Sequence, residues 1–77
     1  MKFEYSKHWA RKRRYRAEIT DDMIEYAITT SDELKDKHWE DASNAICRIP
    51  PSGRILKVVY KRAGKSKYKI ITAYWLD

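Results

Sequence analysis

The stretch from Ser6 to Arg16, SKHWARKRRYR, holds one histidine and six basic residues in eleven positions. Histidine, with an ordinary pKa of about 6.5, can accept or donate a proton near neutral pH. Lysine and arginine can hold a phosphate and stabilise the charge that it gains in a transition state. These residue types fit RNA cleavage that proceeds without a metal ion, with His8 as the candidate for proton transfer.

A helix from Ser6, a suitable N-cap, to about Arg16 would sort these side chains into two sectors, because residues three or four apart share a helix face. One sector, within about 100°, holds His8, Arg11, Lys12 and Tyr15. The other holds Trp9, Arg13 and Arg16, and Trp9 would anchor the helix in the core. The alternatives are that His8 only supports the start of the helix and that the cations are merely solvated.

The charges are separated along the chain instead of being mixed. The net charge is +6 at residues 1–16, −7 at residues 17–41 and +7 at residues 42–77, which gives +6 overall. A soluble surface does not need such segregation, whereas an oriented field attracts a polyanion. We therefore expect a polyanionic partner, and nucleic acid is the usual one.

The order of the expected elements predicts one α+β domain over residues 1–77. A short strand at Met1 to Tyr5 precedes the basic helix, and Thr20 is a suitable N-cap for a second helix over about residues 21–29. Four β segments follow, separated by turn-forming residues: Leu34 to Glu40, Ala45 to Ile49, Ile55 to Arg62 and Tyr68 to Trp75. We expect two N-terminal helices packed on an antiparallel sheet of four or five strands.

Side chains alternate between the two faces of each expected strand. In the segment 55–62, one face would carry Leu56, Val58 and Tyr60, and the other Ile55, Lys57, Val59 and Lys61. In the last segment, one face would carry Tyr68, Ile70, Thr72 and Tyr74, and the other Lys69, Ile71, Ala73 and Trp75. Aromatic residues among lysines can stack bases while the lysines hold phosphates, but packing within the sheet is the favoured interpretation for most of them.

Several short motifs occur in a distinctive order: SKH at the start of the basic helix, then ITDDMIEYAI, SDEL, GRILKVVY and KIITAYW. In this order they resemble the RelE/BrnT-like toxin superfamily, and most of all an uncharacterised prokaryotic family with KH…R, LKVVY and IITAY motifs. The resemblance implies a RelE-like fold. It also implies a metal-independent endoribonuclease, or a decayed version of one, from a toxin-antitoxin pair.

The resemblance and the residue chemistry together assign roles to particular side chains. Catalytic roles are expected for His8, Lys12, Lys57 and Tyr74. RNA-binding roles are expected for Arg11, Arg13, Arg16, Lys61 and Lys69.

No cofactor or metal is expected, because the single cysteine and the two histidines have no zinc-binding spacing. The expected partners are RNA, including ribosome-associated mRNA, and an acidic antitoxin. The chain has neither an apolar run of about 18 residues nor a signal-peptide pattern, so we expect a cytoplasmic protein that does not enter a membrane. Two alternative functions stay open: a non-catalytic RNA-binding module and a protein-interaction domain.

Overall fold

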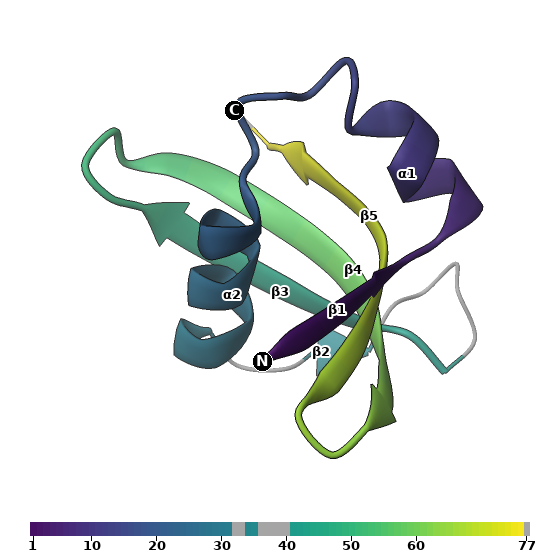
Figure 1. Ribbon diagram of the computed structural model, residues 1–77. Coiled ribbons are helices and arrows are strands. Elements are labelled where there is room, and N and C mark those ends of the chain that lie inside the picture. The colour runs from purple at the N-terminus through teal and green to yellow at the C-terminus, as the bar shows by residue number, and fades with distance from the viewer. Residues whose placement is uncertain (32–33, 36–40, 77) are drawn as a thin grey trace.

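A computed structural model of the chain describes residues 1–31, 34–35 and 41–76. Two helices lie beside a five-stranded mixed sheet with strand order β1-β5-β4-β3-β2 (Figure 1). The elements are β1 (Lys2–Tyr5), α1 (Lys7–Lys12), α2 (Asp21–Thr30), β2 (Leu34–Lys35), β3 (Ser43–Ile49), β4 (Arg54–Gly64) and β5 (Lys67–Trp75). The predicted α+β class with two N-terminal helices is confirmed. No helix in the described ranges has the length and apolar character needed to cross a bilayer.

The strands β2 to β5 form the antiparallel meander that the sequence predicts. The prediction of a wholly antiparallel sheet is wrong at one edge, where β1 pairs with β5 in parallel. The chain leaves β1 through both helices and reaches β5 only after the meander, and a parallel pair requires a long connection of this kind. The predicted strand at residues 34–40 is present at Leu34–Lys35, and residues 36–40 lie outside the described part of the chain.

Both predicted N-caps are confirmed. The hydroxyl of Ser6 accepts a hydrogen bond from the backbone N–H of Trp9, and Thr20 makes the same bond to Met23. These bonds satisfy amide groups that a helix start otherwise leaves without partners. The helix α2 ends at Thr30, within one residue of its expected end.

The first helix is shorter than expected, because it ends at Lys12 and not near Arg16. Its only buried residue is Trp9, so no apolar face packs against the sheet to extend it. The chain continues in turns, in which the backbone N–H of Arg16 bonds to the carbonyls of Lys12 and Arg13. Tyr15 therefore lies beyond the helix, with 80% of its surface exposed, and the predicted four-residue sector loses this member.

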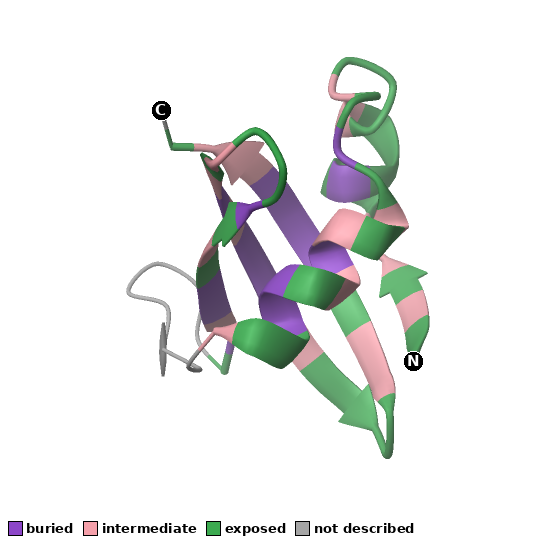
Figure 2. Ribbon diagram, turned by 90° about the vertical axis from the view of Figure 1, so that its left-hand side faces the viewer, coloured by how far each residue is buried: buried purple, intermediate pink, exposed green. Residues whose placement is uncertain are grey.

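The main core lies between α2 and the face of the sheet that it covers (Figure 2). It includes Trp9 of α1, three residues of α2 (Ile24, Ala27, Ile28) and inward side chains of the sheet (Ala45, Ile49, Leu56, Val58, Tyr60, Ile70, Ala73). Trp9 is fully buried, so its predicted role as the anchor of α1 is confirmed. A smaller cluster of Ala42, Val59 and Ile71 lies apart from this core.

A β-bulge in β5 changes which face of the sheet some of its residues occupy, compared with the prediction. Val59 pairs with Thr72 while Tyr60 pairs with Ile70, so Ile71 is an extra residue in β5. One extra residue reverses the alternation beyond it. As a result Ile70 and Ala73 both belong to the main core, and the prediction that Ile70 shares a face with Thr72 and Tyr74 is wrong.

Candidate functional site

The face of the sheet that turns away from α2 carries three lysines, and we call it the lysine face. Lys57 and Lys61 alternate along β4 with the buried residues Leu56, Val58 and Tyr60, which face the core. Lys69 of β5 lies directly opposite Lys61 and therefore on the same face. Tyr60 points into the core, so the lysines of β4, and not Tyr60, lie on the lysine face.

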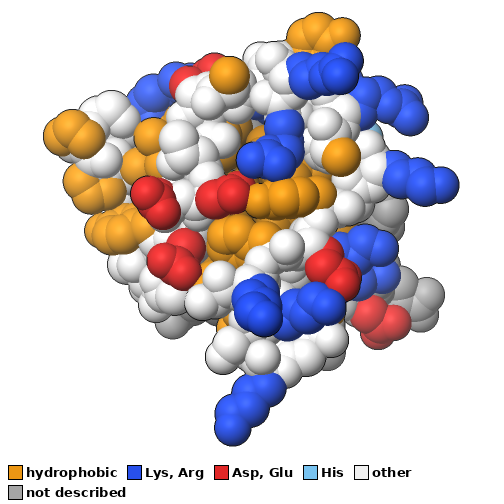
Figure 3. All heavy atoms as spheres, viewed as in Figure 1, with side chains coloured by type: hydrophobic (Ala, Val, Ile, Leu, Met, Phe, Trp, Pro, Cys, Tyr) orange, Lys and Arg blue, Asp and Glu red, His pale blue; other side chains and the backbone are white. Residues whose placement is uncertain are grey.

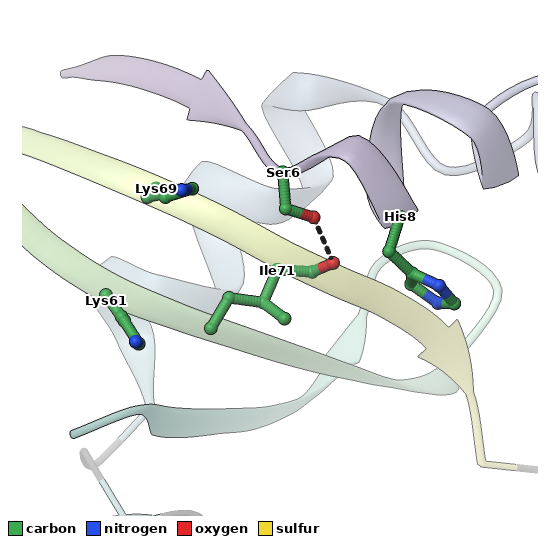
Figure 4. A pocket seen from close by; sticks show the side chains of 5 residues that line it. All are labelled: Ser6, His8, Lys61, Lys69 and Ile71. Atoms are coloured by element: carbon green, nitrogen blue, oxygen red, sulfur yellow. Dashed lines mark hydrogen bonds between the residues drawn. The ribbon is translucent and has the colours of Figure 1, made fainter. Parts of the chain in front are cut away.

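A pocket of about 150 Å³ lies where α1 meets the lysine face (Figure 4). Its lining residues are Ser6, His8, Lys61, Lys69 and Ile71. His8 extends from α1 toward β5 in this view, and its side chain is exposed. The fold thus brings the predicted catalytic histidine together with two predicted RNA-binding lysines that are more than fifty residues away in the chain.

Ser6 fixes the position of α1 relative to β5. Its hydroxyl donates a hydrogen bond of 2.7 Å to the carbonyl of Ile71, and its backbone N–H donates to the carbonyl of Ile70 at 2.9 Å. The same hydroxyl caps α1 through Trp9. Successive side chains of a helix are about 100° apart. Trp9 points into the core, so the side chain of the preceding residue, His8, points away from the core and reaches the lysine face.

Lys61 and Lys69 form a pair of like charges on adjacent strands. Neither makes an ion pair with any carboxylate of the described residues, whereas the neighbouring Lys67 binds Glu4 at 2.8 Å. The hydrogen bond and charge of Lys67 hold the pKa of the Glu4 carboxyl below its usual range, and the charge of Lys69, which lies opposite Glu4, lowers it further. Like charges placed directly opposite each other are unfavourable, and a bound anion would relieve the repulsion.

Lys57, Tyr74 and Arg16 form a second group on the same face. Lys57 and Tyr74 are directly opposite each other in β4 and β5, and the Lys57 Nζ lies 5.8 Å from the centre of the Tyr74 ring. The guanidinium carbon of Arg16 lies 5.9 Å from the same ring centre. Lys57 is four residues from Lys61, about 13 Å along a strand at about 3.3 Å per residue. The predicted catalytic pair Lys57 and Tyr74 is therefore adjacent, but it does not line the His8 pocket.

Arg16 makes intramolecular contacts that the sequence did not predict. Its guanidinium donates hydrogen bonds to the carbonyl of Ala73 at 2.9 Å and to the hydroxyl of Thr72 at 3.4 Å. These bonds attach the chain that follows α1 to the edge of β5. Because the guanidinium is committed to these acceptors, its first role is structural.

Arg13 points to another part of the molecule. Its guanidinium carbon lies 4.2 Å from the centre of the Tyr5 ring, and its nitrogen lies 3.6 Å from the Asp21 carboxylate. The Tyr5 hydroxyl donates a hydrogen bond to the same carboxylate. Burial raises the pKa of the Tyr5 phenol, and the bond to Asp21 raises it further. Arg13 is therefore apart from the pocket, on the side where β1 approaches α2.

Two predicted residues of α1, Arg11 and Lys12, lie three and four residues after His8 on the same helix. Arg11 is exposed and Lys12 is half-buried, and neither lines the pocket. They can extend the cationic surface from the pocket along α1. Within residues 1–31, 34–35 and 41–76 there is no group of three or more His, Cys, Asp or Glu side chains that could hold a metal ion.

The sequence did not predict that Ser6 and Ile71 line the pocket. For Ser6 a signal existed, because an N-cap serine next to a histidine determines where that histidine lies. For Ile71, alternation along the strand placed it on the same side as Lys69, but no local signal indicated the pocket.

Comparison of the chain with models of protein families, with curated proteins and with solved structures finds no match.

Proposed function

We propose that the protein binds RNA through the lysine face and the adjoining helix α1, with a phosphate group in the pocket of His8, Lys61 and Lys69. The observation that carries this proposal is the directly opposed pair of Lys61 and Lys69 in the same pocket as His8, a pair that makes no ion pair with a carboxylate of the described residues. Two ammonium groups that line one pocket favour an anion.

The distribution of charge supports the same orientation on a polyanion. Three acidic residues, Asp21, Asp22 and Glu25, belong to α2, on the opposite side of the sheet from the lysine face. Figure 3 shows acidic side chains gathered around α2. A field with its negative end on α2 and its positive end on the lysine face would turn the lysines toward the phosphates of RNA.

A second function, metal-independent cleavage of RNA, is favoured by the exposed His8 beside two cations. His8 would transfer a proton at the ribose 2′-hydroxyl or at the leaving oxygen, and Lys61 and Lys69 would stabilise the charge on the phosphate. This chemistry agrees with the RelE/BrnT-like resemblance of the sequence. In that case an acidic antitoxin would neutralise the protein by covering the lysine face.

Binding is tested by fluorescence anisotropy of a labelled RNA oligonucleotide at several salt concentrations. Wild-type affinity should fall steeply with salt, and each of Lys61→Gln and Lys69→Gln should weaken binding and reduce the slope by about 0.7, the loss of one phosphate contact on a single strand. The matched control is Arg14→Gln, which removes the same charge from the groove between α1 and α2. Equal losses in all three variants would leave only non-specific attraction and would refute the proposed site.

Cleavage is tested by incubating the protein with mixed RNA in EDTA and analysing the ends of the products. An enzyme of the proposed kind yields 2′,3′-cyclic phosphate ends, and His8→Ala should remove them while RNA binding persists. Binding without any products in the wild type identifies a non-catalytic RNA-binding module. Products that are unchanged in His8→Ala would show that His8 is not the proton-transfer group.

A further inference from the structure

We propose that the pocket of Ser6, His8, Lys61 and Lys69 takes the terminal phosphate of an RNA, a phosphate monoester, in preference to an internal phosphodiester. This inference rests on the proposed RNA binding and specifies which part of the RNA occupies the pocket. Two properties of the pocket carry it: its cations and the carboxylate at its border.

The cations match a dianion better than a monoanion. A phosphate monoester has a second pKa of about 6 and carries a charge between about −1.5 and −2 at pH 7, whereas an internal phosphodiester carries a single charge. Lys61 and Lys69 face each other directly, and His8 lines the same pocket. Two adjacent ammonium groups attract a dianion more strongly than a monoanion.

The cationic surface is interrupted on the β1 side of the pocket. Glu4 lies opposite Lys69 in the parallel pair of β1 and β5, and it binds the next lysine on that face, Lys67, at 2.8 Å. The low pKa of its carboxyl keeps it ionised at neutral pH. An RNA backbone that continued past Lys69 would bring its next phosphate toward this carboxylate, whereas a chain that ends at Lys69 avoids the repulsion.

The pocket is large enough for a phosphate group, with a volume of about 150 Å³, which is below the range of about 300–1,000 Å³ typical of sites for drug-sized ligands. Ser6 is already committed to Ile71 and Trp9, so the lysines and His8 supply the polar contacts to the phosphate oxygens. The rest of the RNA would leave the pocket along the lysine face toward Lys57 and Tyr74.

The test compares three RNA oligonucleotides of one sequence: with a 5′-phosphate, with a 3′-phosphate and with hydroxyls at both ends. We expect one phosphorylated form to bind about tenfold tighter than the hydroxyl form, as one additional charge-assisted contact provides. The two phosphorylated arms show which end enters. Lys61→Gln and Lys69→Gln should abolish the preference, whereas Lys57→Gln, on the same face but outside the pocket, should weaken all three oligonucleotides equally and keep it.

The outcomes separate this inference from the proposed function. Equal binding of the three oligonucleotides that is still weakened by Lys69→Gln would overturn the inference and leave RNA binding at the pocket intact. A preference for a phosphorylated end that survives in both lysine variants would also overturn it, because the end would then bind elsewhere. Absence of binding to all three oligonucleotides would refute both proposals.

Discussion

Lys61 of β4 and Lys69 of β5 are directly opposed across adjacent antiparallel strands, and neither forms an ion pair with a carboxylate in the described part of the chain. Two residues before Lys69, Lys67 forms an ion pair with Glu4 at 2.8 Å, so a lysine on this face can be neutralised within the protein. The opposed lysine pair next to His8 is therefore the feature that most directly suggests an anion site.

The repulsion between the two lysines should be measurable as stability. Lys61→Gln should raise the free energy of unfolding by about 0.2–1 kcal/mol at low salt, because it removes a like charge from a cross-strand pair. The gain should shrink in 1 M salt, where the screening length is about 3 Å. Urea unfolding of the wild type and the variant at both salt concentrations measures this gain. A lower free energy of unfolding in the variant at low salt would contradict repulsion between Lys61 and Lys69.

Arg16 should contribute to folding more than to RNA binding. Arg16→Gln should lower the free energy of unfolding by about 2 kcal/mol, because hydrogen bonds from the charged guanidinium to Ala73 and Thr72 are lost. Arg14→Gln, an exposed change of the same chemistry, should stay within about 0.5 kcal/mol of the wild type. If denaturant unfolding gave the same result for both variants, the attachment of residue 16 to β5 would be energetically unimportant.

Tyr5 should make the protein sensitive to alkaline pH. Its pKa is raised in the folded state by burial and by the bond to Asp21, so folding favours the protonated phenol. This contribution is fully present below the unfolded pKa of about 10 and is lost as the pH rises through the folded value. Above pH 10 the free energy of unfolding should therefore fall more in the wild type than in Tyr5→Phe, which has no phenol to ionise. Urea unfolding of both proteins between pH 8 and 11 measures this difference. A difference that stays constant over that range would disprove the linkage.

Ser6 should determine both the start of α1 and its distance from β5. Ser6→Ala removes the helix cap and the bond to Ile71, so the free energy of unfolding should fall by about 1–2 kcal/mol. Ser6→Thr keeps a hydroxyl that can make both bonds and should restore most of the loss. Thermal or chemical unfolding of the two variants checks this, and indistinguishable stabilities would mean that the hydroxyl has no role.

Local chemistry was sufficient to predict part of the fold. Ser6 and Thr20 both cap helices as expected, because their hydroxyls bond amides only three residues ahead. The buried side of α2 also follows from the spacing of Ile24, Ala27 and Ile28 alone. Lys57 and Lys61 lie four residues apart in β4, so simple alternation of side chains places them on one face.

Features that depend on distant contacts were not predictable from local patterns. The bulge at Ile71 exists only in relation to the pairing partners Val59 and Tyr60, and it decides which residues of β5 enter the core. The parallel pairing of β1 depends on where the chain returns after the meander. In the sequence, Arg16 is one of several neighbouring cations. Its bond to the Ala73 carbonyl depends on the position of residue 16 beside the edge of β5, which the sequence alone does not show.

The central claim is that RNA binds on the lysine face at the pocket between α1 and β5. Titration of the isotope-labelled protein with a short single-stranded RNA, followed by the backbone amide resonances, tests it most directly. RNA should cause the largest shifts at His8, Lys61 and Lys69, and the resonances of α2 should stay nearly unchanged because α2 lies on the other side of the sheet. Shifts concentrated on α2, or no shifts in the pocket at saturating RNA, would contradict it.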